Sequence, residues 1–341
     1  MNKENNEYRR KPVIHLGYGK SASTSLQECI FSNIPEVYFY GKGKVSKDNS
    51  KWLTPEGRSI THKLVNVETY SRFTDNELND IDRHLKNAEN SNSVFLFSNE
   101  QFSESVAPLF QAQQMKSLFP TGKVMIVIRN QYDMLRSLYK FRGHFLEFSP
   151  MPYKGRYVSF KNFVDYAISN MHDVGGHKGR DWHGDYLRII NFSNYIDAYI
   201  DIFGKENVGV FLFEDFIHDR DGFIDRMMRF MSINLRSNDL NIGDCKKNIS
   251  VPSNYIKLKR IRHYFFRNVV FEKLPVFGLV RQLLIRFSSR NNGIHSKEKF
   301  TKEQLIELDK ILATGNNKIN KIFELKLDKY NYPMGTVKSR L

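Results

Sequence analysis

The chain has 341 residues, and its 52 Lys and Arg outnumber its 37 Asp and Glu, which gives a formal net charge of +15. This length can bury a substantial core as one large α/β domain or two smaller ones. The positive charge favours an anionic partner, such as a nucleotide, an acidic glycan, an anionic lipid surface or a nucleic acid, but it does not choose among them.

Apolar runs and amphipathic segments alternate along the chain, which is typical of a parallel sheet covered by helices on both faces. The runs that read as strands are 13–16, 37–40, 94–97, 124–128 and 208–213. The segments that read as helices are 23–31, 76–86, 105–118, 132–141, 160–169, 195–203 and 222–231. We therefore expect a P-loop-like, three-layer α/β/α fold with a central, mainly parallel sheet.

Pro/Gly/Ser-rich linkers and composition breaks do not divide the chain. The prediction is a single domain over 1–341, with a donor-binding core at about 11–255 and a basic, helical C-terminal extension at about 256–341.

The first strand leads into the sequence Gly17-Tyr-Gly-Lys-Ser and then into a hydroxyl-rich helix start at 22–25. Glycines let a backbone approach a phosphate, the amides of a helix N-terminus point at it, and Lys20 supplies positive charge. The nucleoside-triphosphatase pattern needs a glycine five positions before Gly19, where Ile14 stands. The segment thus predicts an anion site that differs from that of a kinase.

Two further strands end in polar residues. The carboxyl ends of parallel strands lie at the same edge of a sheet, and ligands bind outside that edge. Arg129 ends the strand 124–128, and Ser137 follows eight residues later; a guanidinium and a hydroxyl placed in this way suit a phosphate. Glu100 follows Ser98 at the end of 94–97. It is either a catalytic carboxylate or a helix-stabilising charge.

Together these motifs resemble those of sulfotransferases. The loop is similar to their 5′-phosphosulfate loop, and the Arg129 and Ser137 pair to their 3′-phosphate motif. The segments 203–216 and 246–250 resemble the family's late strand and its downstream Asn-x-Ser segment. Two departures are the lack of a proline before the lysine and the lack of a glycine at Ala22 or Ser23.

The resemblance implies 3′-phosphoadenosine 5′-phosphosulfate (PAPS) as donor, 3′,5′-adenosine bisphosphate (PAP) as product and no metal. It implies Lys20 and Glu100 as catalytic residues, with Glu100 as the general base near the acceptor. His144, just past the helix 132–141, is either a residue that faces the acceptor or a structural histidine. The donor-binding residues that the resemblance implies are Gly19, Lys20, Ser21, Ala22, Ser23, Thr24, Ser25, Arg129, Ser137, Lys247 and Ser250.

The acceptor is expected to be a hydroxyl on a glycan or glycolipid, with a lipid, a sterol or a small alcohol as alternatives. A nucleotide kinase and a basic nucleic-acid- or membrane-binding module are more remote alternatives, and nucleic acid is not the expected partner. Basic and apolar residues interleave at 257–267 and 277–286. This pattern fits an ordinary packed helix, and a peripheral contact with a membrane surface stays open.

The compartment is predicted from the N-terminus, the hydropathy and the cysteines. Residues 1–10 are polar, without the apolar core of a secretory signal, and arginines interrupt the most apolar C-terminal stretch. The two cysteines, Cys29 and Cys245, belong to no metal-binding pattern. A reduced, cytoplasmic setting, with the inner face of the membrane as an option, is the expectation.

Overall fold

The computed structural model describes residues 10–41, 54–66, 72–105, 107–141, 157–170, 186–240 and 298–336. These residues fall into two compact units. The first unit takes in the described parts of 10–130, 191–240 and 312–334, and the second those of 131–190, 298–311 and 335–336.

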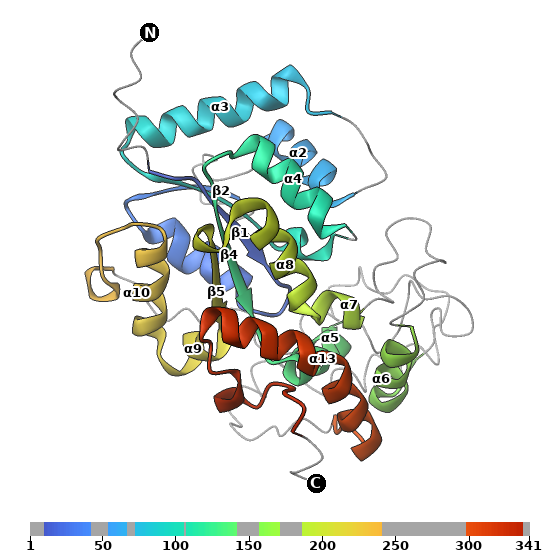
Figure 1. Cartoon of the computed structure of the whole chain (residues 1–341). Coiled ribbons are helices and arrows are strands. Elements are labelled where there is room, and N and C mark those ends of the chain that lie inside the picture. The colour runs from blue at the N-terminus through green and yellow to red at the C-terminus, as the bar shows by residue number, and fades with distance from the viewer. Residues whose placement is uncertain are drawn as a thin grey trace, which may run out of the picture. The chain divides into compact units, whose positions relative to one another are not determined.

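The first unit is built on a five-stranded parallel sheet with the order β2-β3-β1-β4-β5 (Figure 1). The strands are β1 (Val13–Gly17), β2 (Val37–Gly41), β3 (Val94–Asn99), β4 (Lys123–Ile128) and β5 (Val208–Leu212). The predicted strands and the predicted parallel sheet are confirmed. β1 lies in the middle, so the loop that follows it has a strand end on either side.

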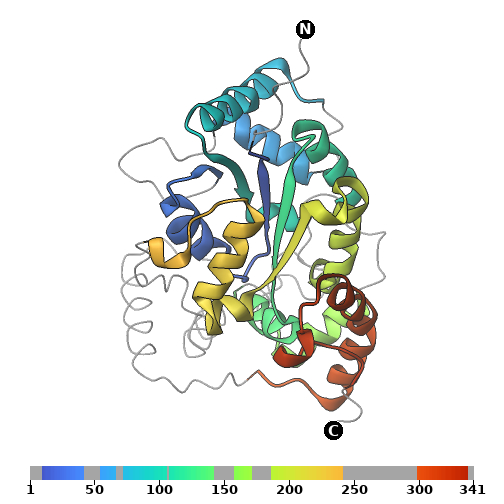
Figure 2. The ribbon, with the colours of Figure 1, turned by 60° about the vertical axis from the view of Figure 1, so that its left-hand side comes forward.

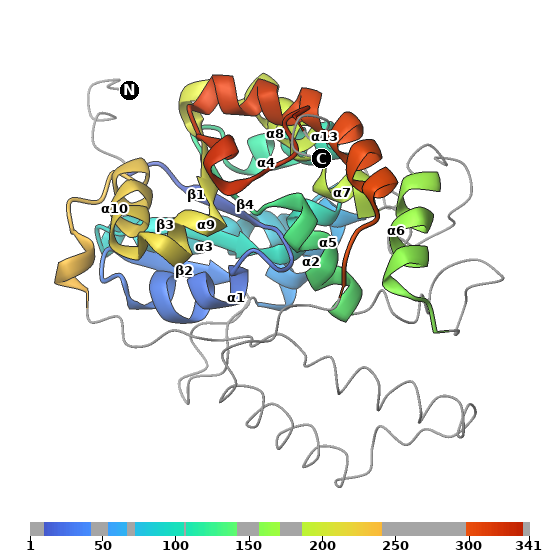
Figure 3. The same cartoon turned by 90° about the horizontal axis from the view of Figure 1, so that it is seen from below.

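Helices cover both faces of the sheet, which explains why its strands are almost continuously apolar (Figure 2). One face carries α1 (Ser23–Ser25), η1 (Leu26–Ile30), η2 (Phe31–Asn33), α9 (Phe213–His218) and α10 (Arg220–Phe230). The helices of the other layer are α2 (Pro55–Val65), α3 (Asp75–Asn90), α4 (Pro108–Leu118) and α8 (Phe192–Phe203). Figure 3 shows α1 and α8 on opposite sides of the sheet.

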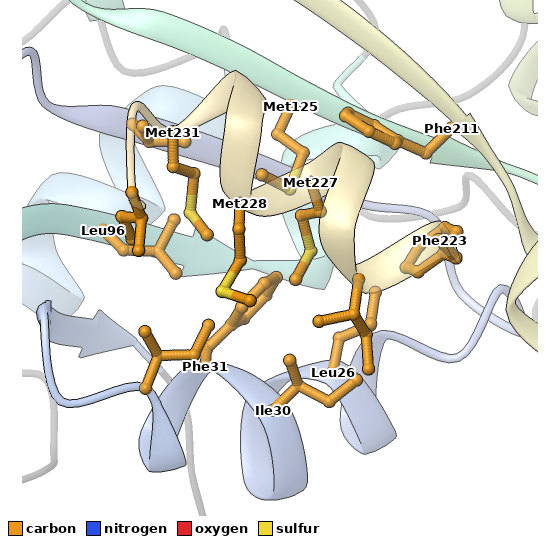
Figure 4. Packing of buried hydrophobic residues seen from close by; sticks show 14 of the residues in the cluster. Leu26, Ile30, Phe31, Leu96, Met125, Phe211, Phe223, Met227, Met228 and Met231 are labelled. Carbon is orange, nitrogen blue, oxygen red and sulfur yellow. The ribbon is translucent and has the colours of Figure 1, made fainter. Parts of the chain in front are cut away.

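A methionine-rich cluster fills the space between the sheet and the α1 and α10 layer. Figure 4 shows Met227 and Met228 of α10 packed toward Leu26, Ile30 and Phe31 of the helical segment that follows the loop. Unbranched, flexible methionine side chains fill irregular gaps of this kind. The core on this face therefore anchors the segment that carries the predicted anion loop.

Cys29 lies in the same cluster and is disulfide-bonded. The reduced state expected from the sequence is therefore wrong for Cys29. Cys245, the other cysteine of the chain, lies outside the described residues.

Several helix bounds differ from the predicted ones for local reasons. α3 extends four residues beyond the predicted end at 86, and the Thr74 and Glu77 capping box sets its start at Asp75. α2, which the sequence analysis did not predict, begins where the Thr54 hydroxyl accepts from the Gly57 amide. The helix expected at 105–118 starts only at Pro108, after a separate 3-10 turn. Proline suits this first helical position because it lacks an N–H.

The second unit is helical in its described part. It contains α5 (Gln131–Phe141), α6 (Phe160–Ser169), α7 (Tyr186–Ile190) and the first residues of α13 (Lys302–Phe323). Phe163 of α6 packs against Tyr139 of α5 and Tyr186 of α7. Lys140 forms an ion pair of 3.3 Å with Glu298. None of the helices in the described ranges is long and apolar enough to cross a membrane.

Met228→Ala should lower the free energy of unfolding by about 2–4 kcal/mol, because it empties part of a closely packed cluster. Urea denaturation measures this, with Ile217→Ala as control. Ile217 is 57% exposed, so its truncation should change stability by less than about 0.5 kcal/mol. Equal denaturation midpoints for the two variants would contradict the assigned core.

Candidate active site

Three neighbouring strands of the first unit end at the predicted site residues. In the sheet register, Leu16 of β1 pairs with Asn99 of β3, and Gly17 pairs with Val127 of β4. Glu100 therefore follows β3 beside the end of β1, and Arg129 follows β4 on the other side. The sheet brings the anion loop, Glu100 and Arg129 to one edge.

The loop after β1 is a tight turn with two strained residues. The Ser21 amide donates to the Tyr18 carbonyl at 3.1 Å, and the Ser23 hydroxyl donates to the same carbonyl at 2.8 Å. Lys20 and Ala22 have left-handed backbones, with φ of 72° and 63°. Such a conformation costs a non-glycine residue roughly 1 kcal/mol or more. The strain at Ala22 explains why a glycine suits this position in similar loops.

The hydroxyls of the loop differ in what they can offer a ligand. Ser21, Ser23 and Ser25 are buried, whereas Thr24 is half-buried. The hydrogen of the Ser23 hydroxyl is used within the loop. The Ser21 oxygen is fully buried and has no hydrogen-bond partner among the described residues. A buried hydroxyl without a partner is unfavourable, so a ligand that satisfies it would be stabilised.

The two glycines of the loop have different structural roles. A Cβ on Gly17 would lie 2.7 Å from Ser23 Oγ and 3.2 Å from the Glu100 Cα. Gly17 is therefore required for the close approach of β1 to the end of β3. A Cβ on Gly19 would meet no atom of the described residues within 4 Å, so the backbone there has space beside it that a bound group could use.

Arg129 connects the end of β4 to the loop. Its Nη1 donates to the Lys20 carbonyl at 2.8 Å, and its guanidinium lies 4.6 Å from the centre of the Phe213 ring. The hydrogen bond fixes the backbone of Lys20, and the ring contact is a cation–π interaction that fixes the plane of the guanidinium. Phe213 was not singled out as a site residue in the sequence, because its contact depends on β5 lying next to β4.

Glu100 begins the 3-10 turn η4 (Glu100–Glu104) and is half-buried. The Asn99 side chain caps this turn by accepting from the Gln101 amide at 2.9 Å. The Ser103 hydroxyl lies 3.0 Å from the Gly17 carbonyl and 3.1 Å from the Glu100 carbonyl, and it can donate to either. The backbone on each side of the carboxylate is thus held against the end of β1.

A buried polar network lies on β1 and β3 just before the loop and Glu100. The Ser98 hydroxyl is 2.8 Å from the ring Nδ1 of His15 and accepts from the Gln27 amide at 2.9 Å. Burial lowers the pKa of His15 to about 3, which keeps the ring neutral. Ser98 therefore ties strand to helix within the core. His15 and Gln27 were not predicted from the sequence, since neither stands in a recognisable motif.

Glu214, the second residue of α9, was missed as well. It accepts from the Asn130 amide at 2.8 Å, next to Arg129. Burial raises the pKa of this carboxyl, while the hydrogen bonds that it accepts and the charge of Arg129 act in the opposite direction. The late-strand similarity at 203–216 covered Glu214, but nothing in the sequence linked it to Arg129.

The other four predicted site residues lie outside the described part of the first unit. Ser137 lies on α5 of the second unit and is half-buried. His144, Lys247 and Ser250 lie outside the described residues, as do the basic segments 257–267 and 277–286. Within the described ranges, no group of three or more His, Cys, Asp or Glu side chains could hold a metal ion.

Residues 10–254 match the sulfotransferase domain family, so the chain belongs to that family, whose members transfer sulfuryl groups. This match, which spans most of the chain, confirms the resemblance read from the loop and from the Arg129 motif. A search of the curated proteins finds no match.

Among solved structures, the chain is similar to a sulfotransferase from Alicyclobacillus acidocaldarius, with 20% identity, a TM-score of 0.44 and coverage of 77% of this chain and 98% of that one. It is also similar to the sulfotransferase domain of the Synechococcus PCC 7002 olefin synthase (12% identity, TM-score 0.39, coverage 84% and 98%). A third is the mouse sulfotransferase SULT7A1 complexed with PAP (10% identity, TM-score 0.34, coverage 83% and 90%).

Gly17→Ala should lower the melting temperature by several degrees, because its methyl group would collide with Ser23 and with the Glu100 backbone. The matched control is Gly19→Ala, whose methyl group meets nothing, and its melting temperature should stay close to that of the parent. Thermal unfolding followed by circular dichroism measures both. The reverse order of the two melting temperatures would disprove the assigned approach of β1 to β3.

Proposed function

We propose that the protein transfers a sulfuryl group from PAPS to an acceptor hydroxyl and releases PAP. The observation that carries the proposal is the convergence of the loop, Glu100 and Arg129 on three adjacent strand ends of one sheet. The Ser21 hydroxyl, which has no partner in the described part of the chain, and the space beside Gly19 suit the anionic end of this donor. The family match supports the type of transfer.

Lys20 is proposed to neutralise the charge that develops on the oxygen between sulfur and the 5′-phosphate. An ammonium about 4 Å from an anionic oxygen contributes up to ~4 kcal/mol at an effective dielectric constant near 20. Only the part of this energy that grows in the transition state accelerates the reaction. The proposed cradle is completed by Gly19, Ser21, Ala22, Ser23, Thr24 and Ser25.

Arg129 and Ser137 are proposed to bind the 3′-phosphate and so to distinguish PAPS from ATP. The guanidinium of Arg129 is already oriented by Phe213 and by the Lys20 carbonyl. The Arg129 side chain therefore loses less conformational entropy when a ligand binds. Lys247 and Ser250, from the segment similar to the downstream family motif, are the further donor contacts proposed from the sequence.

Glu100 is proposed as the general base. The acceptor oxygen attacks sulfur, its proton passes to the Glu100 carboxylate, and the bond from sulfur to the 5′-phosphate oxygen breaks, so that PAP leaves with the negative charge. The short distance between the Glu100 backbone and Gly17 supports this role, since Glu100 then begins beside the end of β1, where the proposed donor loop starts.

The proposed acceptor is a glycan or glycolipid hydroxyl, with His144 as a candidate contact. The Ser98-Asn99-Glu100 sequence and the +15 charge of the chain support an acidic or lipid-linked glycan. A lipid, a sterol or a small alcohol is the alternative. Incubation of radiolabelled PAPS with a panel of these acceptors separates them.

Kinase activity is disfavoured by the position of Ile14. This residue is fully buried inside β1, where a nucleoside-triphosphatase loop would carry its first glycine. A sulfuryl-donor cradle does not require that glycine.

Lys20→Ala should reduce sulfuryl transfer by a factor of about 100 or more while the fold is kept, because the charge opposite the leaving group is lost. Transfer of radiolabelled sulfate from PAPS measures the effect. Lys205→Ala is the control, since Lys205 is exposed and precedes the amino end of β5. Unchanged turnover in Lys20→Ala would refute the assigned role.

Glu100→Gln should reduce turnover by a factor of about 100 or more and leave PAP binding within about twofold, because the amide keeps the shape but cannot accept the proton. Single-turnover kinetics and titration calorimetry with PAP measure the two effects. The control is Glu206→Gln, at an exposed position before β5. Lost PAP affinity with unchanged single-turnover rate would assign Glu100 to donor binding instead.

A further inference from the structure

The turn η10 (Leu327–Tyr330) and the residue Tyr332 lie near the end of the described chain, beyond the residues 10–254 that match the family. They belong to the same unit as Arg129 and hydrogen-bond to residues beside it. The family motifs therefore do not account for these contacts with the proposed 3′-phosphate site.

Glu214 links Tyr332 to the backbone that follows Arg129. The Tyr332 hydroxyl donates to one oxygen of the Glu214 carboxylate at 2.9 Å, and the Asn130 amide donates to the other at 2.8 Å. Tyr332 is 2% exposed. Because both carboxylate oxygens are engaged, loss of the Tyr332 hydroxyl would leave one of them without this donor in a poorly hydrated place.

A second set of contacts holds Asn130 through its side chain. Asn130 Nδ2 donates to the Tyr330 carbonyl at 2.8 Å, and the Tyr330 hydroxyl donates to Asp215 at 2.6 Å. Asp215 also pairs with Arg226 of α10 at 3.0 Å. The C-terminal turn is therefore joined to the start of α9 and to the end of β4 together.

Arg129 receives its orientation from these same elements. Its guanidinium lies on the ring of Phe213, the residue just before Glu214. Its backbone leads directly into Asn130, which Glu214 and Tyr330 hold. A small rotation of this peptide would change where the guanidinium can reach, and a misplaced charged donor loses much of its binding energy.

We propose that the C-terminal turn, acting through Tyr332 and Glu214, positions Arg129 for the 3′-phosphate of the donor. Tyr332 and Glu214 are positioning residues, because they hold the backbone of Arg129 and do not themselves contact the nucleotide. This proposal rests on the proposed function, since it assumes that Arg129 binds the 3′-phosphate.

The test compares the affinity of full-length Tyr332→Phe for PAP and for 5′-AMP, measured by titration calorimetry. We expect PAP binding to weaken about tenfold and 5′-AMP binding to change less than about twofold, because only PAP carries the 3′-phosphate. Tyr199→Phe is the matched control: it removes a buried hydroxyl that donates to Gln111 at 2.8 Å between α8 and α4. The PAP to 5′-AMP affinity ratio should stay unchanged in this control.

A double-mutant cycle with Arg129→Ala identifies the route of the effect. If Tyr332 acts through Arg129, then Tyr332→Phe should not weaken PAP binding further in the Arg129→Ala background. A tenfold loss in both backgrounds, or an unchanged affinity ratio in the single variant, would overturn the positioning role.

Two measurements separate this failure from a failure of the proposed function. If the parent protein does not bind PAP more tightly than 5′-AMP, or if Arg129→Ala leaves their ratio unchanged, the assigned 3′-phosphate site is wrong and the positioning role falls with it. Thermal melting checks the fold of each variant. If Tyr332→Phe does not fold, Tyr330→Phe tests the other side-chain link of the C-terminal turn, the bond from the half-buried Tyr330 to Asp215 at the start of α9. The same loss of PAP affinity relative to 5′-AMP is then expected.

Discussion

The close approach of the end of β1 to the end of β3 is the constraint on which the site depends. Gly17 permits it, because any side chain there would meet Ser23 and the backbone of Glu100. With β1 in the middle of a parallel sheet, the loop after it has Glu100 on one side and Arg129 on the other. The distances between the proposed catalytic groups thus follow from strand spacing and register, with no separate scaffold required.

The loop keeps a strained shape because its surroundings hold it. Left-handed Lys20 and Ala22 are unfavourable in isolation. Three interactions offset this cost. They are the hydrogen bond from Arg129 to the Lys20 carbonyl, the two hydrogen bonds that the Tyr18 carbonyl accepts, and the apolar cluster beneath the following helix. Arg129 therefore organises the loop, in addition to the role proposed for it at the 3′-phosphate of the donor.

Polar groups also lie inside the core. Their hydrogen bonds are directional, so they select which strands and helices pack together more strictly than apolar contacts do. Ser98 joins β3 to His15 of β1 and to Gln27 of the helical segment. Glu214 and the buried Tyr332 form a second, partly buried network at the end of β4. Buried polar groups are stable only when they are hydrogen-bonded, so each network fixes which elements meet.

The sequence alone determined the strands, the parallel sheet and the family, because long apolar runs and fixed motif spacings are local properties of the chain. It also gave Lys20, Glu100 and Arg129 as candidates, since each follows a strand at the carboxyl edge. Only the tertiary structure decided that Ser98 turns into the core, that Ser23 closes the loop and that Phe213 and Glu214 hold the Arg129 segment. Except for the local bond of Ser23 to Tyr18, these contacts join residues far apart in the chain. Their geometry depends on strand order and packing, which no local pattern encodes.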